Sequence, residues 1–111
     1  MSALLGDGKG GFVLSSSVPL PANTGPVSVA MGDFNGDQHP DLVTANQTTS
    51  GATVLLGDGL GAFKISPPSP LPAGSFPLGV AVGDFNLDKK PDFAISNSSG
   101  NTVTVHLNQS Q

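Results

Sequence analysis

Residues 32–41 read Gly-Asp-Phe-Asn-Gly-Asp-Gln-His-Pro-Asp, and residues 83–92 read Gly-Asp-Phe-Asn-Leu-Asp-Lys-Lys-Pro-Asp. The two stretches lie 51 residues apart, and the same offset, without a gap, matches Leu4-Leu5-Gly6-Asp7-Gly8 to Leu55-Leu56-Gly57-Asp58-Gly59. It also matches Pro19-Leu20-Pro21-Ala22 to Pro70-Leu71-Pro72-Ala73. One offset that serves every match indicates an internal duplication, in which residues 1–60 are equivalent to residues 52–111.

The periodicity outside the acidic stretches is that of β-strands. Apolar and small residues alternate before each acidic stretch, and short β-branched runs follow it, bounded by Gly, Asn, Asp and Pro. Such runs predict antiparallel strands, and no window carries a helical stripe of useful length. In the complete repeat we expect strands near residues 27–31, 42–45, 52–56 and 63–66.

A four-stranded antiparallel unit of about fifty residues, repeated in tandem, predicts an all-β fold of β-propeller blades. A single eight-stranded sandwich is the alternative, but a duplicated meander fits radial packing more simply. We therefore expect residues 1–111 to form one unit of two four-stranded blades.

The phase of the repeat predicts how the blades are completed. The chain starts at the tail of a third strand (residues 3–5), continues with a fourth strand near residues 12–14, and ends after another third strand at residues 102–107. An edge without its fourth strand is a template for another chain. We expect the outer strand to be supplied in trans, so that copies of the chain form a closed homo-oligomeric ring.

The composition excludes several partners. Charged residues are 11% of the chain, all eight acids are aspartates, and the four lysines give a net charge of −4. No basic patch is available for nucleic acid, and the apolar stretches are far too short to span a membrane. No signal peptide opens the sequence, and with no cysteine the chain has no disulfides.

The acidic stretches have the donor spacing of a site for a hard cation. Side-chain oxygens recur at positions one, three, five and nine, and a main-chain carbonyl at position seven would add another ligand. Calcium binds six to eight oxygens, whereas the alternative is a pair of hairpin turns shaped by Asx hydrogen bonds. Because the spacing occurs twice and includes six of the eight aspartates, we predict Ca²⁺ held by Asp33, Asn35, Asp37, His39 and Asp41, and by Asp84, Asn86, Asp88, Lys90 and Asp92, with His39 and Lys90 binding through their carbonyls.

Two features predict modest affinity and a difference between the loops. The glycine usual at position six is replaced by Gln38 and Lys89. The first loop carries three carboxylates, and in the second Lys89 and Lys90 offset two of the three. We expect the first loop to bind calcium more tightly, with dissociation constants on the order of 10⁻⁴–10⁻³ M, as in extracellular modules.

Together these motifs resemble the FG-GAP/VCBS repeats of integrin α-subunit propellers and of large bacterial surface or secreted proteins. The resemblance rests on Gly-Asp-Phe-Asn-x-Asp-x-x-Pro-Asp, an apolar strand, and Leu-Leu-Gly-Asp-Gly-x-Gly-x-Phe. It implies propeller blades with calcium in the loop between the first two strands, bound through the side chains of both loops named above. It also implies a truncated or designed two-repeat fragment of an extracellular or cell-surface bacterial protein.

Nothing in the sequence indicates an enzyme, so we expect a non-catalytic structural repeat. His39 and His106 have no cysteine partner, and the Gly-Asp-Gly segments at Asp7 and Asp58 are interpreted as hairpin turns. A carbohydrate-binding propeller is the alternative, although sugar sites usually rely on aromatic faces and this chain has no Trp or Tyr. The phenylalanine pairs Phe12/Phe63 and Phe34/Phe85 have core-like spacing. The sequence identifies no glycan or protein ligand.

Overall fold

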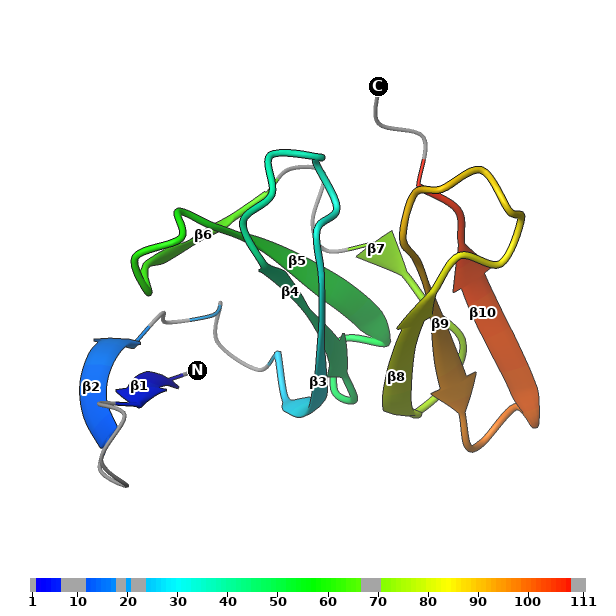
Figure 1. The fold of residues 1–111 in the computed structure, drawn as a ribbon. Coiled ribbons are helices and arrows are strands. Elements are labelled where there is room, and N and C mark those ends of the chain that lie inside the picture. The colour runs from blue at the N-terminus through cyan, green and yellow to red at the C-terminus, as the bar shows by residue number, and fades with distance from the viewer. Residues whose placement is uncertain (1, 7–11, 18–19, 21–23, 67–70, 109–111) are drawn as a thin grey trace.

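The structure is a computed structural model that describes residues 2–6, 12–17, 20, 24–66 and 71–108. These residues form ten strands and no helix, so none of them lies in a helix long and apolar enough to cross a membrane. The all-β prediction is confirmed. Figure 1 shows the strands in three groups that follow one another along the chain.

The three groups are separate antiparallel sheets. An N-terminal hairpin pairs β1 (Ser2–Gly6) with β2 (Phe12–Ser17). The first blade has the order β3-β4-β5-β6, and β7 also pairs with β5. The second blade has the order β10-β9-β8. The bounds in the first blade are β3 Pro26–Gly32, β4 Asp41–Asn46, β5 Gly51–Gly57, β6 Phe63–Ile65 and β7 Leu71–Pro72. Those in the second are β8 Pro77–Gly83, β9 Asp92–Asn97 and β10 Thr102–His106.

The strand registers repeat at the offset of 51 residues. In the first blade Val43 pairs with Val54, and in the second Ala94 pairs with Val105. The hairpin obeys the same rule, because Leu5 pairs with Val13 as Leu56 pairs with Lys64. The chain thus supplies strands three and four of one unit, all four of the next, and the first three of another, which is the predicted strand order.

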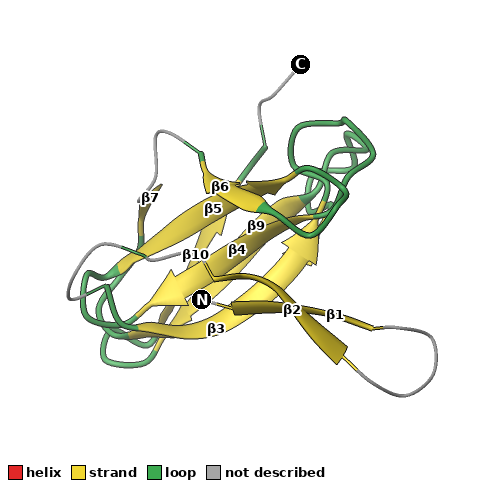
Figure 2. Ribbon diagram, turned by 90° about the vertical axis from the view of Figure 1, so that its left-hand side faces the viewer, coloured by secondary structure: helices red, strands yellow, loops and turns green. Residues whose placement is uncertain are grey.

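The two blades pack face to face through their inner strands. β8 contacts both β3 and β4, and Figure 2 looks along this stack, with the hairpin in front of the blades. The core lies between them and includes Val43, Ala45 and Ala52 from the first blade and Phe93 and Ile95 from the second. Burying a Val, Leu or Ile side chain is worth roughly 1.5–3 kcal/mol, so this small core accounts for the packing of one blade on the other.

The phenylalanine pairs do not share one environment. Phe34 is 9% exposed and packs edge-on against Phe93, with ring centroids 6.1 Å apart. Its equivalent Phe85 is 51% exposed, so the expectation of a core position was wrong for Phe85. The reason is that Phe34 packs on the blade that follows it, whereas no described blade follows Phe85. Phe63 is partly buried, and the side chain of Phe12 is outside the described residues.

Candidate metal centres

Each acidic loop joins the first two strands of a blade, and both loops lie at the same end of the stack (Figure 1). The first aspartate organises the turn. The Asp33 carboxylate accepts the N–H groups of Gly36 at 2.9 Å, Asp37 at 3.2 Å and Gln38 at 2.8 Å. Asp84 accepts those of Asp88 at 3.1 Å and Lys89 at 2.7 Å. Both loops therefore fold around the carboxylate at position one.

The turn requires left-handed backbone at positions four and six. The φ angles are 76° at Gly36 and 69° at Gln38 in the first loop, and 62° at Leu87 and 69° at Lys89 in the second. For a residue with a Cβ this conformation costs roughly 1–2 kcal/mol. The first loop carries that strain at one residue and the second at two. The sequence pattern predicted a strained turn at position six, where Gln38 and Lys89 replace the usual glycine. It did not predict the left-handed backbone at position four, although the glycine at Gly36 was a sign of it.

The ninth aspartate of each loop is a structural anchor. Asp41 is fully buried, and its two oxygens accept the N–H of Phe34 at 2.9 Å and that of Gly57 at 2.8 Å. Asp92 is buried in the same way and accepts the N–H groups of Phe85 at 2.9 Å and Asn108 at 2.7 Å. Each carboxylate thus fastens the start of its loop to the end of the third strand.

The structure brings the predicted carboxylates together. One oxygen from each of three aspartates lies within 4.8 Å of the others, in the set Asp33, Asp37 and Asp41 and in the set Asp84, Asp88 and Asp92. The N–H groups of His39 and Lys90 donate to Asp37 at 2.9 Å and to Asp88 at 3.0 Å. The atoms that could bind a metal in both clusters are carboxylate oxygens, which are hard ligands and suit calcium rather than a softer metal.

The asparagine at position three tests the fit of a cation. In the orientation that satisfies hydrogen bonding, Asn86 Nδ2 donates to Asp84 Oδ1 at 3.1 Å and to Asp88 Oδ1 at 2.9 Å. The reverse orientation turns the amide oxygen toward the same two atoms and leaves three oxygens converging with no hydrogen between them. With the amide nitrogen inward, the amide hydrogens bridge the carboxylates. With the amide oxygen inward, only a cation can hold the three oxygens together, and that arrangement of oxygens fits a bound ion. In the first loop Asn35 Oδ1 accepts the Asp37 N–H at 3.4 Å.

The turn after the third strand packs against the first loop. A Cβ at Gly59, whose φ is 80°, would collide with the ring of His39. Asp58 Oδ1 accepts the N–H groups of Leu60 at 2.7 Å and Ala62 at 3.2 Å, which holds the pKa of Asp58 below its usual value. Its expected role as a turn residue is confirmed, whereas Asp7 lies outside the described residues. His39 and His106 both make structural contacts, the latter through Nε2 to the carbonyl of Pro72 at 2.7 Å.

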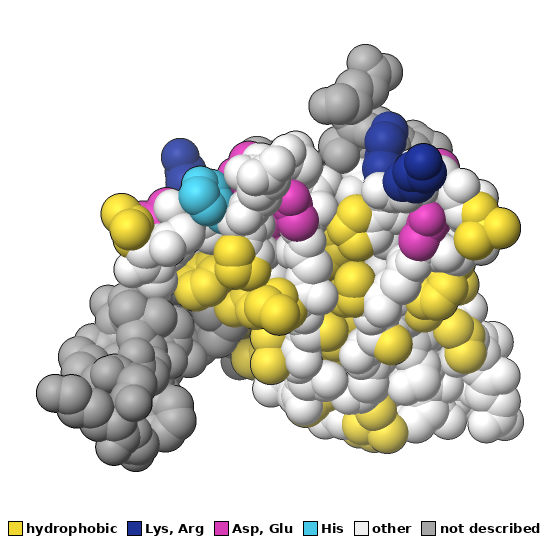
Figure 3. Space-filling model, in the orientation of Figure 1, with side chains coloured by type: hydrophobic (Ala, Val, Ile, Leu, Met, Phe, Trp, Pro, Cys, Tyr) yellow, Lys and Arg dark blue, Asp and Glu magenta, His cyan; other side chains and the backbone are white. Residues whose placement is uncertain are grey.

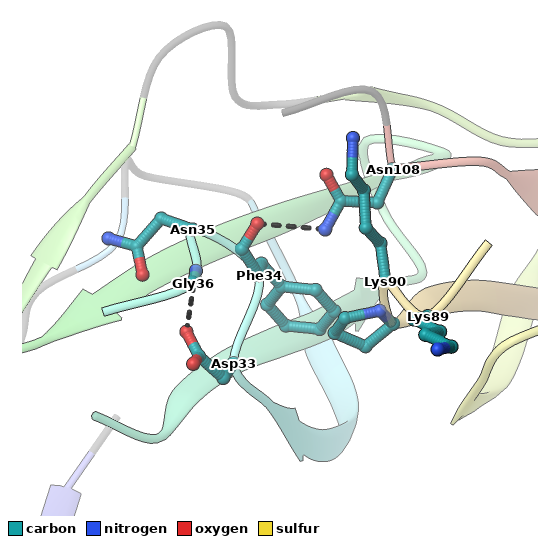
Figure 4. Close-up of a pocket in the computed structure, with 8 residues that line it drawn as sticks. Asp33, Phe34, Asn35, Gly36, Lys89, Lys90 and Asn108 are labelled. Atoms are coloured by element: carbon teal, nitrogen blue, oxygen red, sulfur yellow. Dashed lines mark hydrogen bonds between the residues drawn. The ribbon is translucent and has the colours of Figure 1, made fainter. Parts of the chain in front are cut away.

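A cavity of about 300 Å³ lies between the two loops. Asn108 closes one side, and its Nδ2 donates to the carbonyl of Phe34 at 2.8 Å, which ties the end of the second blade to the first loop (Figure 4). Charged side chains of both signs gather at this end of the molecule (Figure 3). The lining residues are Asp33, Phe34, Asn35, Gly36, Lys89, Lys90, Pro91 and Asn108.

The fold and the loops define a class of protein: tandem four-stranded antiparallel units, stacked face to face, with an aspartate-rich loop between the first two strands of each. The chain belongs to the FG-GAP-like repeat family, whose model matches residues 1–44 and 33–95. The resemblance predicted from the motifs is therefore confirmed, and the units are propeller blades. Repeats of this family are generally structural and often bind calcium. No curated protein and no solved structure matches the chain significantly.

Proposed function

We propose that this chain is a non-catalytic structural repeat that assembles with copies of itself into a closed β-propeller, whose blades are braced by calcium in the acidic loops. One observation carries the proposal: both blades place three carboxylates within 4.8 Å of one another, and a buried aspartate anchors each cluster to the strands. Two equivalent clusters in one small chain indicate a role that every blade needs.

Calcium would supply charge neutralisation in both loops. The side chains of Asp33, Asn35, Asp37 and Asp41 would hold one ion, and their counterparts 51 residues later would hold the other, with the carbonyls of His39 and Lys90 as further ligands. At a free calcium concentration ten times the dissociation constant, binding stabilises the fold by about 1.4 kcal/mol per site. Affinities on the order of 10⁻⁴–10⁻³ M suit an extracellular or cell-surface bacterial protein, where calcium is abundant.

The first loop is proposed to bind more tightly than the second. Its charge is −3 from three carboxylates, whereas Lys89 and Lys90 reduce the second to −1. The second loop also holds Leu87 and Lys89 in left-handed backbone, which adds strain to a turn that the ion has to hold. Both effects favour Asp33–Asp41, and equal affinities of the two loops in calorimetry would refute this ranking.

Assembly is proposed to complete the second blade. Among the described residues, the outer edge of β10 has no partner strand, whereas the equivalent edge of β5 pairs with β6 and β7. The hairpin strand β2 is the equivalent of β6, since it repeats the register of β6 at the offset of 51. The β2 strand of one copy would therefore supply the fourth strand of the second blade of another.

Titration and mass measurement test the proposal together. We expect calorimetry to show calcium binding that is weakened by Asp37→Asn, and light scattering to show a discrete multiple of the 11.1 kDa chain. The control is Asp58→Asn, which removes one negative charge from the same end of the molecule but outside both clusters. Absence of calcium binding would refute the metal role, and a monomer at micromolar concentration would refute the assembly.

Carbohydrate binding is a second candidate, favoured by the cavity between the loops. The cavity is lined by polar side chains from both blades and by Phe34, the kind of inter-blade position where a sugar hydroxyl finds several partners. The Phe34 ring is 9% exposed and offers little stacking surface, so the structural role ranks first. Reproducible calcium-dependent hits on a glycan array would reverse this order if Lys90→Ala abolishes them, because that variant keeps the main-chain carbonyl proposed for calcium and removes a side chain that lines the cavity.

A further inference from the structure

The outer face of the second blade is an exposed apolar surface. This face consists of the side chains of β8–β10 that point away from the first blade, and it includes Val103 and Val105, which are 64% and 49% exposed. A shallow groove of about 320 Å³ runs along it, lined in part by Gly79, Ala81 and Ala94. Scattered single apolar residues need no explanation, but a grooved apolar sheet face indicates an interaction site.

The same face of the first blade shows what covers such a surface. Shifted by 51 residues, the positions of Ala94, Val103 and Val105 become Val43, Ala52 and Val54. In the first blade these residues belong to the core or pack against it, because the second blade lies on them. The change in exposure from Phe34 to Phe85, from 9% to 51%, has the same cause. The outer face of the second blade therefore repeats a buried interface without its other half.

The complementary half is exposed on the first blade. The second blade uses Val80 and Val82 of β8 to pack against the core. Their equivalents on β3 are Val29 and Met31, which are 55% and 64% exposed. One chain thus carries both halves of a blade–blade interface on opposite sides, and each half is seen in contact with its counterpart inside the same molecule.

We propose that β3 of a second copy of this chain docks on the outer face of the second blade, and that it forms a copy–copy seam equivalent to the interface between the two blades of one chain. This inference rests on the proposed self-assembly and specifies its surfaces. Such a head-to-tail contact closes into a ring when its rotation permits. The charges agree, because the seam brings Lys89 and Lys90 of one copy beside the more acidic first loop of the next, as the interface within one chain does.

The internal interface predicts individual contacts across the seam. A Cβ built on Gly32 lies 3.0 Å from Val82 Cγ1, so Gly83 of one copy is expected beside Met31 of the next. By the same offset, Phe85 takes the place of Phe34 and meets Leu42 in the place of Phe93. One contact has no counterpart: the hydrogen bond from Asn108 to Phe34 is lost, because Gly57 stands at the equivalent position and has no side chain.

Cysteine cross-linking tests the seam directly, since the chain has no native cysteine. One preparation carries Gly83→Cys and another carries Met31→Cys, and the two are mixed and oxidised. Disulfide-bonded residues have Cβ atoms about 3.5–4.5 Å apart. Within one chain a Cβ at Gly32 would lie 3.0 Å from Val82 Cγ1, the place that the Sγ of a cysteine at residue 82 could take. The matched control is therefore the double variant Gly32→Cys/Val82→Cys, which should close an intramolecular disulfide.

We expect a disulfide-linked dimer from the mixture on a non-reducing gel, and at least about tenfold less from either variant alone. Dimers formed equally by a single variant would indicate a symmetric contact and overturn the head-to-tail seam. If the native chain is an oligomer and the control closes but the mixture does not, the seam is wrong while self-assembly stands. If light scattering shows that the native chain is a monomer and the mixture does not cross-link, both are wrong.

A second variant avoids dependence on cysteine geometry. Val103→Asp places a charge at the centre of the proposed seam on a side chain that is already 64% exposed, so the folded chain tolerates it. The control is Leu60→Asp, at a turn residue that is 81% exposed and outside the seam. We expect Val103→Asp alone to shift the native oligomer to monomer, and an unchanged oligomer would overturn the seam.

Discussion

Replacing Asp41 by asparagine separates the structural role of this loop from its proposed metal role. Both oxygens of the buried Asp41 carboxylate accept backbone N–H groups, from Phe34 at 2.9 Å and Gly57 at 2.8 Å. The amide of the substituted side chain keeps one acceptor and turns an NH₂ group toward the other donor. A hydrogen bond to a charged group contributes about 1.5–3 kcal/mol, and an unsatisfied buried donor costs about 1–3 kcal/mol. We therefore expect Asp41→Asn to lower the free energy of unfolding by about 2–4 kcal/mol.

Thermal unfolding in the presence of a chelator measures this effect without calcium. For a domain of this size each kcal/mol shifts Tm by about 4–8 °C, so the expected loss is roughly 8–32 °C. The control is Asp37→Asn, because Asp37 is exposed and accepts only the His39 N–H at short range. Asp37→Asn should leave Tm nearly unchanged in chelator and abolish the gain produced by calcium at the first loop. If Asp41→Asn melts with the native protein in chelator, its two hydrogen bonds do not hold the loop and the reasoning fails.

Three further predictions concern the second loop, the hairpin and the β5–β6 turn. Lys89→Gly removes left-handed strain of about 1 kcal/mol, so Tm should rise by a few degrees. It also removes one positive charge, so calorimetry should show tighter calcium binding in the second loop, and an unchanged affinity there would contradict this. Leu5→Pro removes a backbone donor from β1 and weakens its pairing with β2. Because β1 competes with a neighbour's β10 for β2, light scattering should show more assembly, and less assembly would contradict the exchange of β2. Because the pKa of Asp58 is lowered in the folded chain, its carboxylate stabilises the turn above the pKa of the unfolded chain, and this stability is lost as pH falls through the folded pKa. The NMR chemical shift of the Leu60 amide should follow this titration in the native chain and should not follow it in Asp58→Asn.

The strand order and the loops could be predicted because their signals are local. Alternation with period two, turn residues and a single offset specify where strands begin and which strand of a blade each one forms. The spacing of oxygens at positions one, three, five and nine likewise brings the carboxylates together within one turn. The left-handed backbone at Leu87 left no such signal, because only Gly36 in the other loop reveals that position four needs it.

Long-range contacts could not be predicted from the same patterns. Asp41 finds the N–H of Gly57 sixteen residues away, and Asn108 reaches the carbonyl of Phe34 across the two blades. The environment of Phe85 depends on a following blade, and equal spacing in the sequence carries no information about whether one is present. The sequence repeat predicts which residues of the two blades are equivalent, whereas the exposed fraction of each side chain depends on which segment packs against it.

The hydrogen bonds also sharpen the argument for calcium. The carboxylates at positions one and nine are accounted for by backbone N–H groups whether or not an ion binds, because Asp33 shapes the turn and Asp41 anchors it. Positions three and five distinguish a metal site from a hydrogen-bonded turn. Asn86 and Asp88 are exposed, and without an ion the Asn86 amide donates to Asp84 Oδ1 and Asp88 Oδ1, the two oxygens that an ion would bind. If calcium binds, the Asn86 amide turns its oxygen inward, and its two side-chain NH resonances lose their carboxylate partners. A titration that moves the Asn86 side-chain signals together with calcium uptake would therefore separate a metal site from a hydrogen-bonded turn of the same sequence.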